Sequence, residues 1–379
     1  MSILTDLCRI FVMKRLLCII SCMNAGGAET FLMKVYRVLD RAKYQMDFAV
    51  NIKEKGFYDD EIKRLGGQIY YFPSKSKTPL GYVWGLKKII QKNHYECVLR
   101  ITSNAMGFLD LAIAKFAGAK RCIARSSNSS DGASFFSKVA HFVGGILFKR
   151  FVNVKIAPST DAALYTFGKK DVTSGKVSIL SNGLDLNYYR YDGNGRKRIR
   201  EEFGIDPDCF VVGHVGRFNT QKNHLFLLDV FSQFHKENSN SKLLLVGDGS
   251  LKEQIVSKIQ KNGLDNSVVL ASIRSDMPAL YSAMDVFAFP SLYEGMPNTV
   301  IEAQACGLKC IISDRITKEA DITNNVSYLS IKENDIQIWT NKLAKSMKKI
   351  SNVCALPSDY DIKNVVLKFQ KLVFGLNNV

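Results

Sequence analysis

The chain has 379 residues, of which 46% are hydrophobic and 23% charged, and it is therefore long enough for two domains that each bury a core. No stretch reaches the roughly 18 consecutive apolar residues of a membrane-spanning helix. The nine cysteines include no Cys-x-x-Cys pair, which argues against a disulfide scaffold and favours reduced cysteines in a cytoplasmic protein.

The net charge of +17 is concentrated in the first half of the chain. Residues 1–185 hold 28 Lys and Arg against 14 Asp and Glu, whereas residues 186–379 hold 24 against 21. A basic domain is attracted to an anionic membrane surface, a phosphorylated acceptor or nucleic acid, and charge alone does not choose among them. Nucleic acid is the least expected partner, because the sequence contains no motif of interleaved basic and aromatic residues.

Apolar runs alternate with helical patterns throughout the first half. The runs cover 16–22, 46–51, 68–72, 96–100, 121–125, 154–157 and 177–180, and the helical patterns cover 28–40, 58–65, 82–92, 107–117, 134–149 and 160–167. This alternation predicts a mostly parallel sheet covered by helices on both faces, with ligands bound beyond the carboxyl ends of the strands. The first run follows Lys14-Arg15 and superficially resembles a signal peptide, but the Gly26-Gly27 turn after it favours a buried strand. Residues 1–12 precede the predicted start of the fold.

Three segments of the first half are candidate contact regions. Gly26 and Gly27 open a helix and allow close backbone approach, although such a pair often only turns the chain. Ser127 and Asn128 follow a strand and offer hydrogen-bonding groups, or belong to a Ser-rich surface loop. Residues 132–150 combine aromatic residues with a basic end, which is typical of either a membrane-facing amphipathic segment or a half-buried helix.

The sequence changes character after Asn182-Gly183-Leu184-Asp185, and we place a domain linker near residue 186. The basic cluster at 196–200 predicts a solvated helix rather than a nucleic-acid site. Asp206-Pro207-Asp208 and Asp359-Tyr360-Asp361 have the spacing of a metal motif, but neither ends a strand, so we expect turns and no metal.

The second half begins with a strand pattern that ends at Gly216-Arg217, and Thr220–Asn223 is expected to start the next helix. Arg217 and Lys222 can converge on one anion, and Gly216 has no side chain that would keep the anion away from the backbone. Alone, an Arg and a Lys five positions apart are usually surface charges. Two further strand patterns lead to the turn Gly247-Asp248-Gly249 and to Ser272-Ile273-Arg274.

Glu294 and Glu302 lie eight positions apart, on either side of a predicted helix start. Gly295 can adopt positive φ, Pro297 suits the first turn of a helix, and Gly307 is a typical stop. A helix start attracts an anion, and flanking carboxylates accept hydrogen bonds from hydroxyl groups on either side of it. A nucleotide diphosphate sugar has this layout; the alternative is a solvated helix with two unrelated glutamates.

The run from Pro290 to Gly307, with its two glutamates, resembles the signature of glycosyltransferase family 4, and the resemblance extends over nearly the whole chain. It implies an α/β protein of the GT-B fold, with two facing Rossmann-like doubly wound domains and an interdomain cleft. The family retains the anomeric configuration and uses no metal and no other cofactor.

The resemblance also implies roles for individual residues. Glu302 would hold the donor ribose, Glu294 would contact the donor sugar, and Arg217 and Lys222 would bind the diphosphate, which makes Arg217, Lys222 and Glu294 the predicted catalytic residues. The remaining predicted donor-binding residues are Gly26, Gly27, Gly216, Ile273, Arg274, Gly295, Met296, Pro297, Asn298 and Thr299. The predicted acceptor-side residues are Glu29, Ser127 and Asn128. Related polysaccharide enzymes often have a histidine where Ser127 stands, and this chain departs from that pattern.

The sequence therefore predicts an acceptor-binding domain over 1–185, a nucleotide-sugar-binding domain over 186–357, and a C-terminal helix over 358–379 that crosses back to the first domain. The predicted activity is transfer of a sugar from a nucleotide sugar, best a UDP-sugar, to a lipid-linked saccharide in surface polysaccharide biosynthesis. We expect a cytoplasmic protein that associates peripherally with the anionic inner face of the plasma membrane. Two alternatives remain, a sugar-nucleotide epimerase of the same fold and a non-catalytic, membrane-associated binding subunit.

Overall fold

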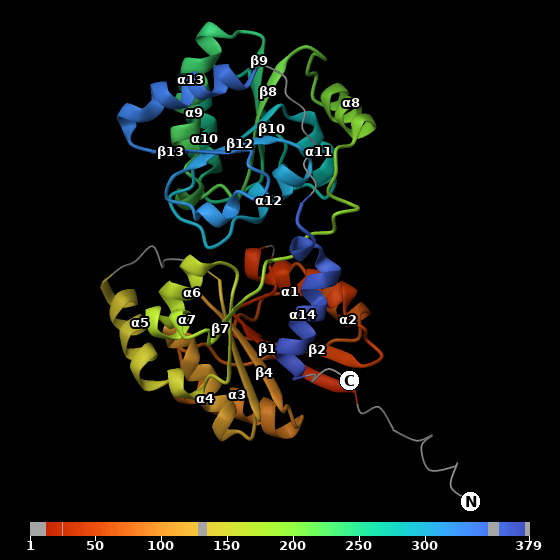
Figure 1. Ribbon diagram of the computed structural model, residues 1–379, viewed down its shortest axis with the longest axis vertical. Coiled ribbons are helices and arrows are strands. Elements are labelled where there is room, and N and C mark those ends of the chain that lie inside the picture. The colour runs from red at the N-terminus through yellow and green to blue at the C-terminus, as the bar shows by residue number, and fades with distance from the viewer. Residues whose placement is uncertain (1–12, 25, 128–134, 348–355, 376–379) are drawn as a thin grey trace, which may run out of the picture. The chain divides into compact units, whose positions relative to one another are not determined.

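The computed structural model describes residues 13–24, 26–127, 135–347 and 356–375, which form two compact α/β units (Figure 1). Unit 1 comprises the described residues up to Gly183 together with those from Ile362 onward, and unit 2 comprises Leu184–Asp361. Each unit has one parallel sheet with helices on both of its faces, as the sequence predicts.

The sheet of unit 1 has seven parallel strands in the order β3-β2-β1-β4-β5-β6-β7. Its strands are β1 (Lys14–Ile20), β2 (Tyr44–Val50), β3 (Ile69–Tyr71), β4 (Cys97–Thr102), β5 (Arg121–Ser126), β6 (Val154–Ala157) and β7 (Val177–Ile179). Every strand lies within a few residues of a predicted run, so these seven predictions are confirmed. The segment after Lys14-Arg15 is the buried central strand β1.

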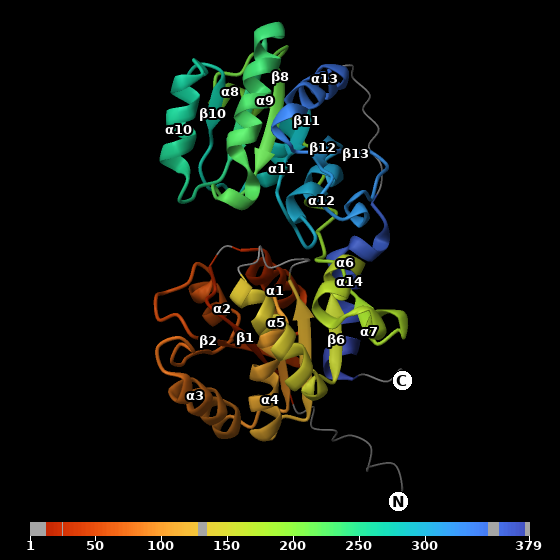
Figure 2. The same ribbon diagram turned by 90° about the vertical axis from the view of Figure 1, so that its left-hand side faces the viewer.

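Alternate side chains of β1 enter two different cores, because successive residues of a strand point to opposite faces of the sheet. Leu16 and Cys18 pack with α1 and α14, whereas Leu17 and Ile19 pack with α3, α4 and α6. Figures 1 and 2 show helices on each side of this sheet. The helices of unit 1 are α1 (Gly27–Val38), α2 (Asp59–Arg64), α3 (Pro79–Lys92), α4 (Phe108–Phe116), α5 (Phe135–Leu147), α6 (Thr160–Phe167), α7 (Lys169–Thr173) and α14 (Ile362–Phe374), with the short 3-10 helices η1 (Ala105–Gly107) and η2 (Lys149–Phe151).

Helix α14 comes from the end of the chain and packs in the core of unit 1. Its Phe369 ring lies 6.1 Å from the Phe31 ring on α1, and its Phe374 ring lies 4.6 Å from the Tyr44 ring on β2. These aromatic contacts make the last helix part of the first unit.

The sheet of unit 2 has six parallel strands in the order β10-β9-β8-β11-β12-β13. Its strands are β8 (Phe210–Val215), β9 (Ser241–Val246), β10 (Val268–Leu270), β11 (Val286–Phe289), β12 (Lys309–Ser313) and β13 (Val326–Leu329). Its helices are α8 (Gly193–Glu202), α9 (His224–Glu237), α10 (Lys252–Lys261), α11 (Met277–Ala283), α12 (Asn298–Ala305) and α13 (Ile336–Ser346), with the 3-10 helices η3 (Thr220–Lys222), η4 (Lys318–Ala320), η5 (Glu333–Asp335) and η6 (Ser358–Tyr360). Two separate cores, one on each face, hold these helices to the sheet.

Both sheets contain a point where the strand order reverses. In unit 1 the chain builds outward from β1 to β3 and then returns to place β4 on the other side of β1. In unit 2 the same reversal places β11 beside β8. Ligands of open parallel sheets bind outside the carboxyl ends of the strands at such reversals, so the β1/β4 and β8/β11 edges are where sites are expected.

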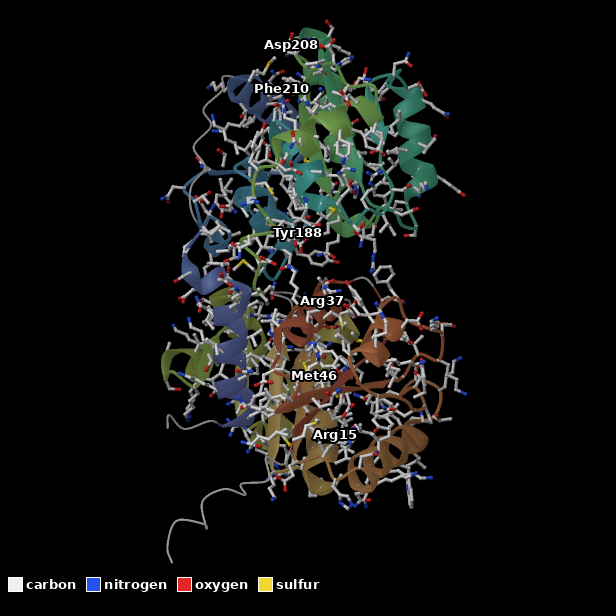
Figure 3. The ribbon with its side chains drawn as sticks, turned by 90° about the vertical axis from the view of Figure 1, so that its right-hand side faces the viewer. Arg15, Arg37, Met46, Tyr188, Asp208 and Phe210 are labelled. Carbon is white, nitrogen blue, oxygen red and sulfur yellow. The ribbon has the colours of Figure 1, made fainter. Side chains whose placement is uncertain are left out.

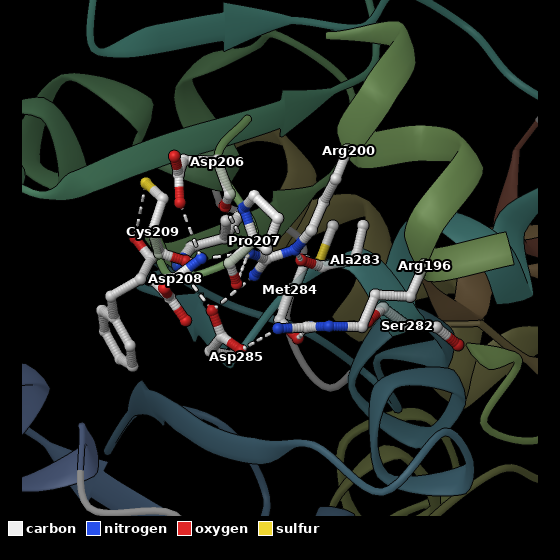
Figure 4. Close-up of polar contacts among 12 residues, drawn as sticks. Arg196, Arg200, Asp206, Pro207, Asp208, Cys209, Ser282, Ala283, Met284 and Asp285 are labelled. Carbon is white, nitrogen blue, oxygen red and sulfur yellow. Dashed lines mark hydrogen bonds and ion pairs between the residues drawn. The ribbon is translucent and has the colours of Figure 1, made fainter. Parts of the chain in front are cut away.

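The prediction of a solvated basic helix at 196–200 is wrong for two of its arginines. Arg200 is 4% exposed, and both Arg196 and Arg200 form ion pairs with Asp285, at 2.7 and 2.8 Å (Figure 4). Arg200 also donates hydrogen bonds to the carbonyl oxygens of Ala283, Asp206, Pro207 and Cys209. These two arginines therefore fix α8 to unit 2, because buried cations require paired charges and acceptors.

The Asp206-Pro207-Asp208 motif lies at the amino end of β8. Figure 3 shows Asp208 beside Phe210, the first residue of β8, and Tyr188 at the opposite end of unit 2. The Asp206 carboxylate accepts a bond from the Asp208 backbone N–H, as in an Asx turn. Within the described ranges, no group of three or more His, Cys, Asp or Glu side chains is arranged to hold a metal ion.

Replacing Arg200 with methionine should lower the free energy of unfolding by about 3 kcal/mol, because it removes one of the two cations paired with Asp285 and leaves several buried carbonyl groups without their donor. Urea unfolding followed by circular dichroism measures the change. Lys197→Met on the same helix is the matched control, since Lys197 is 80% exposed and should change the value by less than about 0.5 kcal/mol. Equal stability of the two variants would contradict the structural role of Arg200.

Candidate functional site

Glu294 and Glu302 lie on either side of the start of α12, after the carboxyl end of β11. They are 9% and 7% exposed, so the alternative of a solvated helix with unrelated glutamates does not describe them. Helix α12 begins at Asn298, and Pro297 immediately precedes it instead of occupying its first turn as predicted. Fixed φ at Pro297 still suits this position, because the chain enters the helix from an extended conformation.

Lys222 and Glu294 form an ion pair. The Lys222 Nζ lies 2.6 Å from Glu294 Oε1, and the two side chains are 16% and 11% exposed. The ammonium group also lies 4.7 Å from the centre of the Phe289 ring, which adds a cation–π contact. The structure thus brings together two predicted catalytic residues that are 72 positions apart.

Two hydrogen bonds, one from a side chain and one from the backbone, hold the two loops of this ion pair together. Gln221 Nε2 donates to the carbonyl oxygen of Tyr293 at 2.8 Å, and the Leu292 N–H donates to the carbonyl oxygen of Gln221 at 2.8 Å. Gln221 is therefore a positioning residue that the sequence did not identify. Its only indication in the sequence was that it immediately precedes Lys222.

Lys222 ends the 3-10 helix η3 and is not in the following α-helix, contrary to the prediction for 220–223. Asn219 accepts a hydrogen bond from the Lys222 N–H at its start, and Asn223 has φ of 56°, which breaks the chain before α9. Asparagine tolerates this left-handed conformation better than most residues. The break orients Lys222 separately from α9.

Two buried histidines lie next to Lys222. His214 donates from Nδ1 to the carbonyl oxygen of Ala288 at 2.8 Å, and its ring lies 4.5 Å from that of His224. Burial lowers the pKa of His214 well below its ordinary value, and burial together with the charge of Lys222 lowers the pKa of His224 to about 4. Both imidazoles are therefore neutral at pH 7, and Lys222 carries the positive charge of this cluster.

Two glycines lie beside this cluster, where an added side chain would be crowded at Gly216 and would collide with the backbone at Gly247. A Cβ on Gly216 would lie 3.1 Å from His214 Nε2 and 3.2 Å from Lys222 Cδ. A Cβ on Gly247, which has φ of +146°, would lie 2.1 Å from the carbonyl oxygen of Gly216. The Gly-rich turn after β9 therefore packs directly against the backbone that follows β8.

Glu302 accepts a hydrogen bond from the Tyr281 hydroxyl at 3.0 Å. Burial, with the negative charge of Glu302, raises the pKa of both Tyr281 and Tyr189, so both phenols remain protonated donors. The sequence carried no signal for these tyrosines, because they come from separate segments. One carboxylate oxygen of Glu302 is oriented by Tyr281, and the group can accept further bonds from a ligand.

The other predicted donor-binding residues of unit 2 lie around the same edge. Arg217 follows β8 and is exposed, Ile273 is 68% exposed, and Thr299 has a buried Oγ1 without a hydrogen-bond partner among the described residues. Arg274 instead forms ion pairs with Glu202 and Asp276. Ser272 has φ of 51°, in the left-handed region of the backbone. Gly295 and Met296 are buried in the loop before α12.

In unit 1, Gly26 precedes α1 as its N-cap residue and Gly27 begins the helix. A Cβ on Gly26 would lie 2.4 Å from Glu29 Oε2, so this glycine makes room for the Glu29 carboxylate. Glu29 and Ser127 line one pocket of about 360 Å³ beyond the carboxyl ends of β1, β4 and β5. Asn128 lies outside the described residues.

Comparisons with known proteins identify the family of this chain. A model of the family described as glycosyl transferases group 1 matches residues 195–358. The protein named as glycosyltransferase EpsF of Bacillus subtilis (strain 168) is 34% identical over 338 residues, which cover 88% of this chain and 88% of that protein. This chain belongs to the group 1 glycosyltransferases. The predicted family is therefore confirmed.

Two more similarities concern sequence and fold. This chain is 28% identical over 340 residues to the UDP-Gal:alpha-D-GlcNAc-diphosphoundecaprenol alpha-1,3-galactosyltransferase of Escherichia coli, with 84% of each protein covered. It matches the crystal structure of Anabaena Alr3699/HepE in complex with UDP-glucose with a TM-score of 0.74 at 20% identity, over 96% of this chain and 100% of that chain. The likeness confirms the prediction of a GT-B fold built from two Rossmann-like units.

Because the two buried histidines are neutral in the folded protein, we expect the protein to lose stability in acid. The unfolded chain takes up protons on histidine below pH 6.5, whereas buried His224 resists protonation until about pH 4. Its contribution to stability is therefore complete above pH 6.5 and decreases as the pH falls from 6.5 towards 4, by about 2 kcal/mol at pH 5. Between pH 7 and pH 5, the free energy of unfolding of His224→Phe should therefore fall by about 2 kcal/mol less than that of the unmodified chain. Urea unfolding at the two pH values measures this difference.

His94→Asn is the matched control for this measurement. His94 is exposed and has φ of 55°, a conformation that asparagine also adopts. It should leave the pH dependence unchanged. An unaltered pH dependence in His224→Phe would show that His224 is protonated as readily in the folded protein as in the unfolded chain.

Proposed function

We propose that this glycosyltransferase moves a sugar from a UDP-sugar to a lipid-linked saccharide in surface polysaccharide biosynthesis, with retention of configuration and without a metal ion. The observation that carries the proposal is the Lys222–Glu294 ion pair at the carboxyl edge of β8 and β11. A cation beside a carboxylate at this edge supplies the two groups that the diphosphate and the sugar hydroxyls of the donor require.

Each charged or polar protein group at this edge of unit 2 would bind one part of the donor. Lys222 and Arg217 would bind the diphosphate and stabilise the negative charge that it gains as the bond to the sugar breaks. The free N–H groups at the start of α12 would add to this stabilisation. Glu294 would accept a hydrogen bond from the sugar, and Glu302, oriented by Tyr281, one from the ribose diol. With two cations on the leaving group, no step requires a metal ion.

The comparisons support the choice of donor and acceptor. HepE was crystallised with UDP-glucose, and the name of the E. coli relative gives UDP-Gal as donor and a diphosphoundecaprenol-linked sugar as acceptor. We propose the same two classes for this chain: a UDP-sugar for unit 2 and a lipid-linked saccharide for unit 1. Retention would follow if the acceptor attacks from the face that the diphosphate leaves.

Lys222→Ala and Glu294→Ala should each lower the transfer rate at least about a hundredfold, because each removes a charged group from the reacting donor. Release of UDP and formation of a glycosylated acceptor are measured with purified, folded protein. Lys258→Ala is the matched control: Lys258 forms an ion pair with Asp229 at the same 2.6 Å distance on another helix pair, and its loss should leave the rate unchanged.

Two outcomes would contradict the proposed function. Full activity of either site variant would remove that residue from the mechanism. Conversion of the nucleotide sugar to an isomer without any acceptor would instead identify the epimerase of the same fold.

We also propose that unit 1 binds an anionic membrane surface through α5. Val139, Phe142 and Ile146 are 45%, 67% and 63% exposed and follow helical spacing along one stripe. The opposite side of the helix is fixed to η1, where the Ala105 N–H donates to His141 Nδ1 at 3.2 Å. Lys138 and Arg150 are exposed at the two ends of the stripe, in a half of the chain with a large excess of basic residues. Such an apolar stripe flanked by cations suits an anionic bilayer interface.

Every helix in the described ranges falls short of the length and apolar character that crossing a bilayer requires. Peripheral binding is tested by sedimentation with vesicles that contain phosphatidylglycerol. The double variant Phe142→Glu/Ile146→Glu should bind at least about tenfold more weakly, because each buried apolar side chain contributes on the order of 1.5–3 kcal/mol. Ile338→Glu, at a position 50% exposed on α13, is the control and should bind normally. Unchanged binding of the double variant would rule out α5 as the contact.

A further inference from the structure

The pocket of unit 1 lies at the reversal of its strand order. Ile20 ends β1 and Ser21 follows it, whereas Thr102 ends β4 and Ser103 and Asn104 follow it. Its volume of about 360 Å³ is within the range of small-molecule sites, and its position is where parallel sheets bind ligands. Both its size and its place therefore indicate a binding site.

Two cations in the wall of this pocket share one buried carboxylate. Arg100 Nε lies 2.9 Å from Asp110 Oδ2, and Lys75 Nζ lies 2.6 Å from Asp110 Oδ1. Asp110 is fully buried and also accepts a hydrogen bond from the Tyr82 hydroxyl at 2.8 Å. One cation is enough to neutralise Asp110, so the cluster carries one positive charge in excess.

Arg100 has a structural role in the sheet, whereas Lys75 has none. Arg100 belongs to β4, and its Nη1 donates to the carbonyl oxygen of Ile19 at 3.1 Å, which fixes it between two strands. Lys75 comes from the loop between β3 and α3 and extends over the Tyr82 ring, with its Nζ 4.7 Å from the ring centre. Removing Lys75 would leave Asp110 paired with Arg100 and Tyr82.

The Lys75 ammonium group is placed to meet a ligand. Its side chain is 34% exposed and lines the pocket, and an ammonium group has three donors, of which Asp110 takes one. Burial lowers the pKa of Lys75, since its charge has lost part of its hydration. An oxyanion in the pocket would replace this lost hydration with a charge-assisted hydrogen bond.

The remaining lining is suited to hydroxyl groups. Glu29 presents a carboxylate, and Ser103, Asn104 and Ser127 present neutral polar groups. A pocket with cations on one wall and hydrogen-bonding groups elsewhere fits a saccharide that carries a negatively charged group, and does not fit an apolar ligand.

We propose that this pocket is the acceptor subsite and that Lys75, supported by Arg100 and Asp110, binds an oxyanion of the acceptor. This inference rests on the proposed function and identifies a chemical feature of its acceptor. The oxyanion comes from one of two sources, the diphosphate that links a saccharide to its lipid or the carboxylate of an acidic sugar. Both would place acceptor hydroxyls towards Glu29 and Ser127.

Binding of inorganic pyrophosphate and of glucuronate to the full chain tests the proposal by titration calorimetry. Saturating UDP is present throughout, so that the Lys222 site does not bind the probe. At least one of the two anions should bind the unmodified chain, and Lys75→Met should weaken that binding at least about tenfold through loss of a charge-assisted bond. Lys75→Arg should restore it, and Lys77→Met, at an exposed position in the same loop, should leave it unchanged.

Each result has a defined meaning. Lys75-dependent binding of pyrophosphate identifies a diphosphate acceptor, and Lys75-dependent binding of glucuronate identifies an acidic sugar. Failure of both anions to bind, or equal binding by the Lys75→Met variant, overturns the proposal.

Thermal stabilisation by UDP, measured on the same samples, separates this inference from the proposed function. UDP should raise the unfolding temperature of the Lys75→Met variant as much as that of the unmodified chain. No stabilisation of any sample, with Lys75-dependent anion binding intact, would overturn the UDP-sugar donor and retain the anion site. In transfer assays Lys75→Met should raise the KM for the acceptor at least about tenfold and lower kcat much less.

Discussion

The ion pair between Lys222 and Glu294 is the interaction on which the proposed donor edge of unit 2, at the carboxyl ends of β8 and β11, depends. Neither residue belongs to a long regular element: Lys222 ends a 3-10 turn, and Glu294 lies in the loop before α12. Two hydrogen bonds through Gln221 and the cation–π contact with Phe289 keep them in place. Because both side chains are mostly buried, each charge requires the other until a ligand arrives. An entering diphosphate would share the lysine, which would leave the glutamate able to accept a sugar hydroxyl.

The strand order of the two sheets explains why chemistry-bearing residues gather at one edge of each unit. Residues after β8 and β11 meet because these strands are neighbours, although 70 residues of chain separate Val215, the end of β8, from Val286, the start of β11. In unit 1 the same reversal brings the ends of β1 and β4 to the pocket that contains Glu29 and Arg100. In both units, polar and charged residues therefore gather where the strand order reverses, although the residues themselves differ.

The sequence predicted those features that depend on local patterns. Apolar runs located the seven strands of unit 1, and the residues from Pro290 to Gly307 indicated the family and the two glutamates. Contacts between distant segments could not be predicted, because periodicity does not show which side chains meet. For this reason the sequence did not indicate Gln221 or Tyr281. It also placed Arg200 on a solvated face, since the partner Asp285 lies 85 positions away.

The close approach of Gly247 to the carbonyl oxygen of Gly216 divides the donor edge into fixed and adaptable parts. At 2.1 Å, even a methyl group at position 247 would displace the backbone that carries Arg217, so no side chain can be introduced there to adjust the fit of a ligand. Ile273, at 68% exposure, has no such restriction. A side chain at position 273 can therefore be exchanged without moving the backbone, whereas the glycine turn admits no such change.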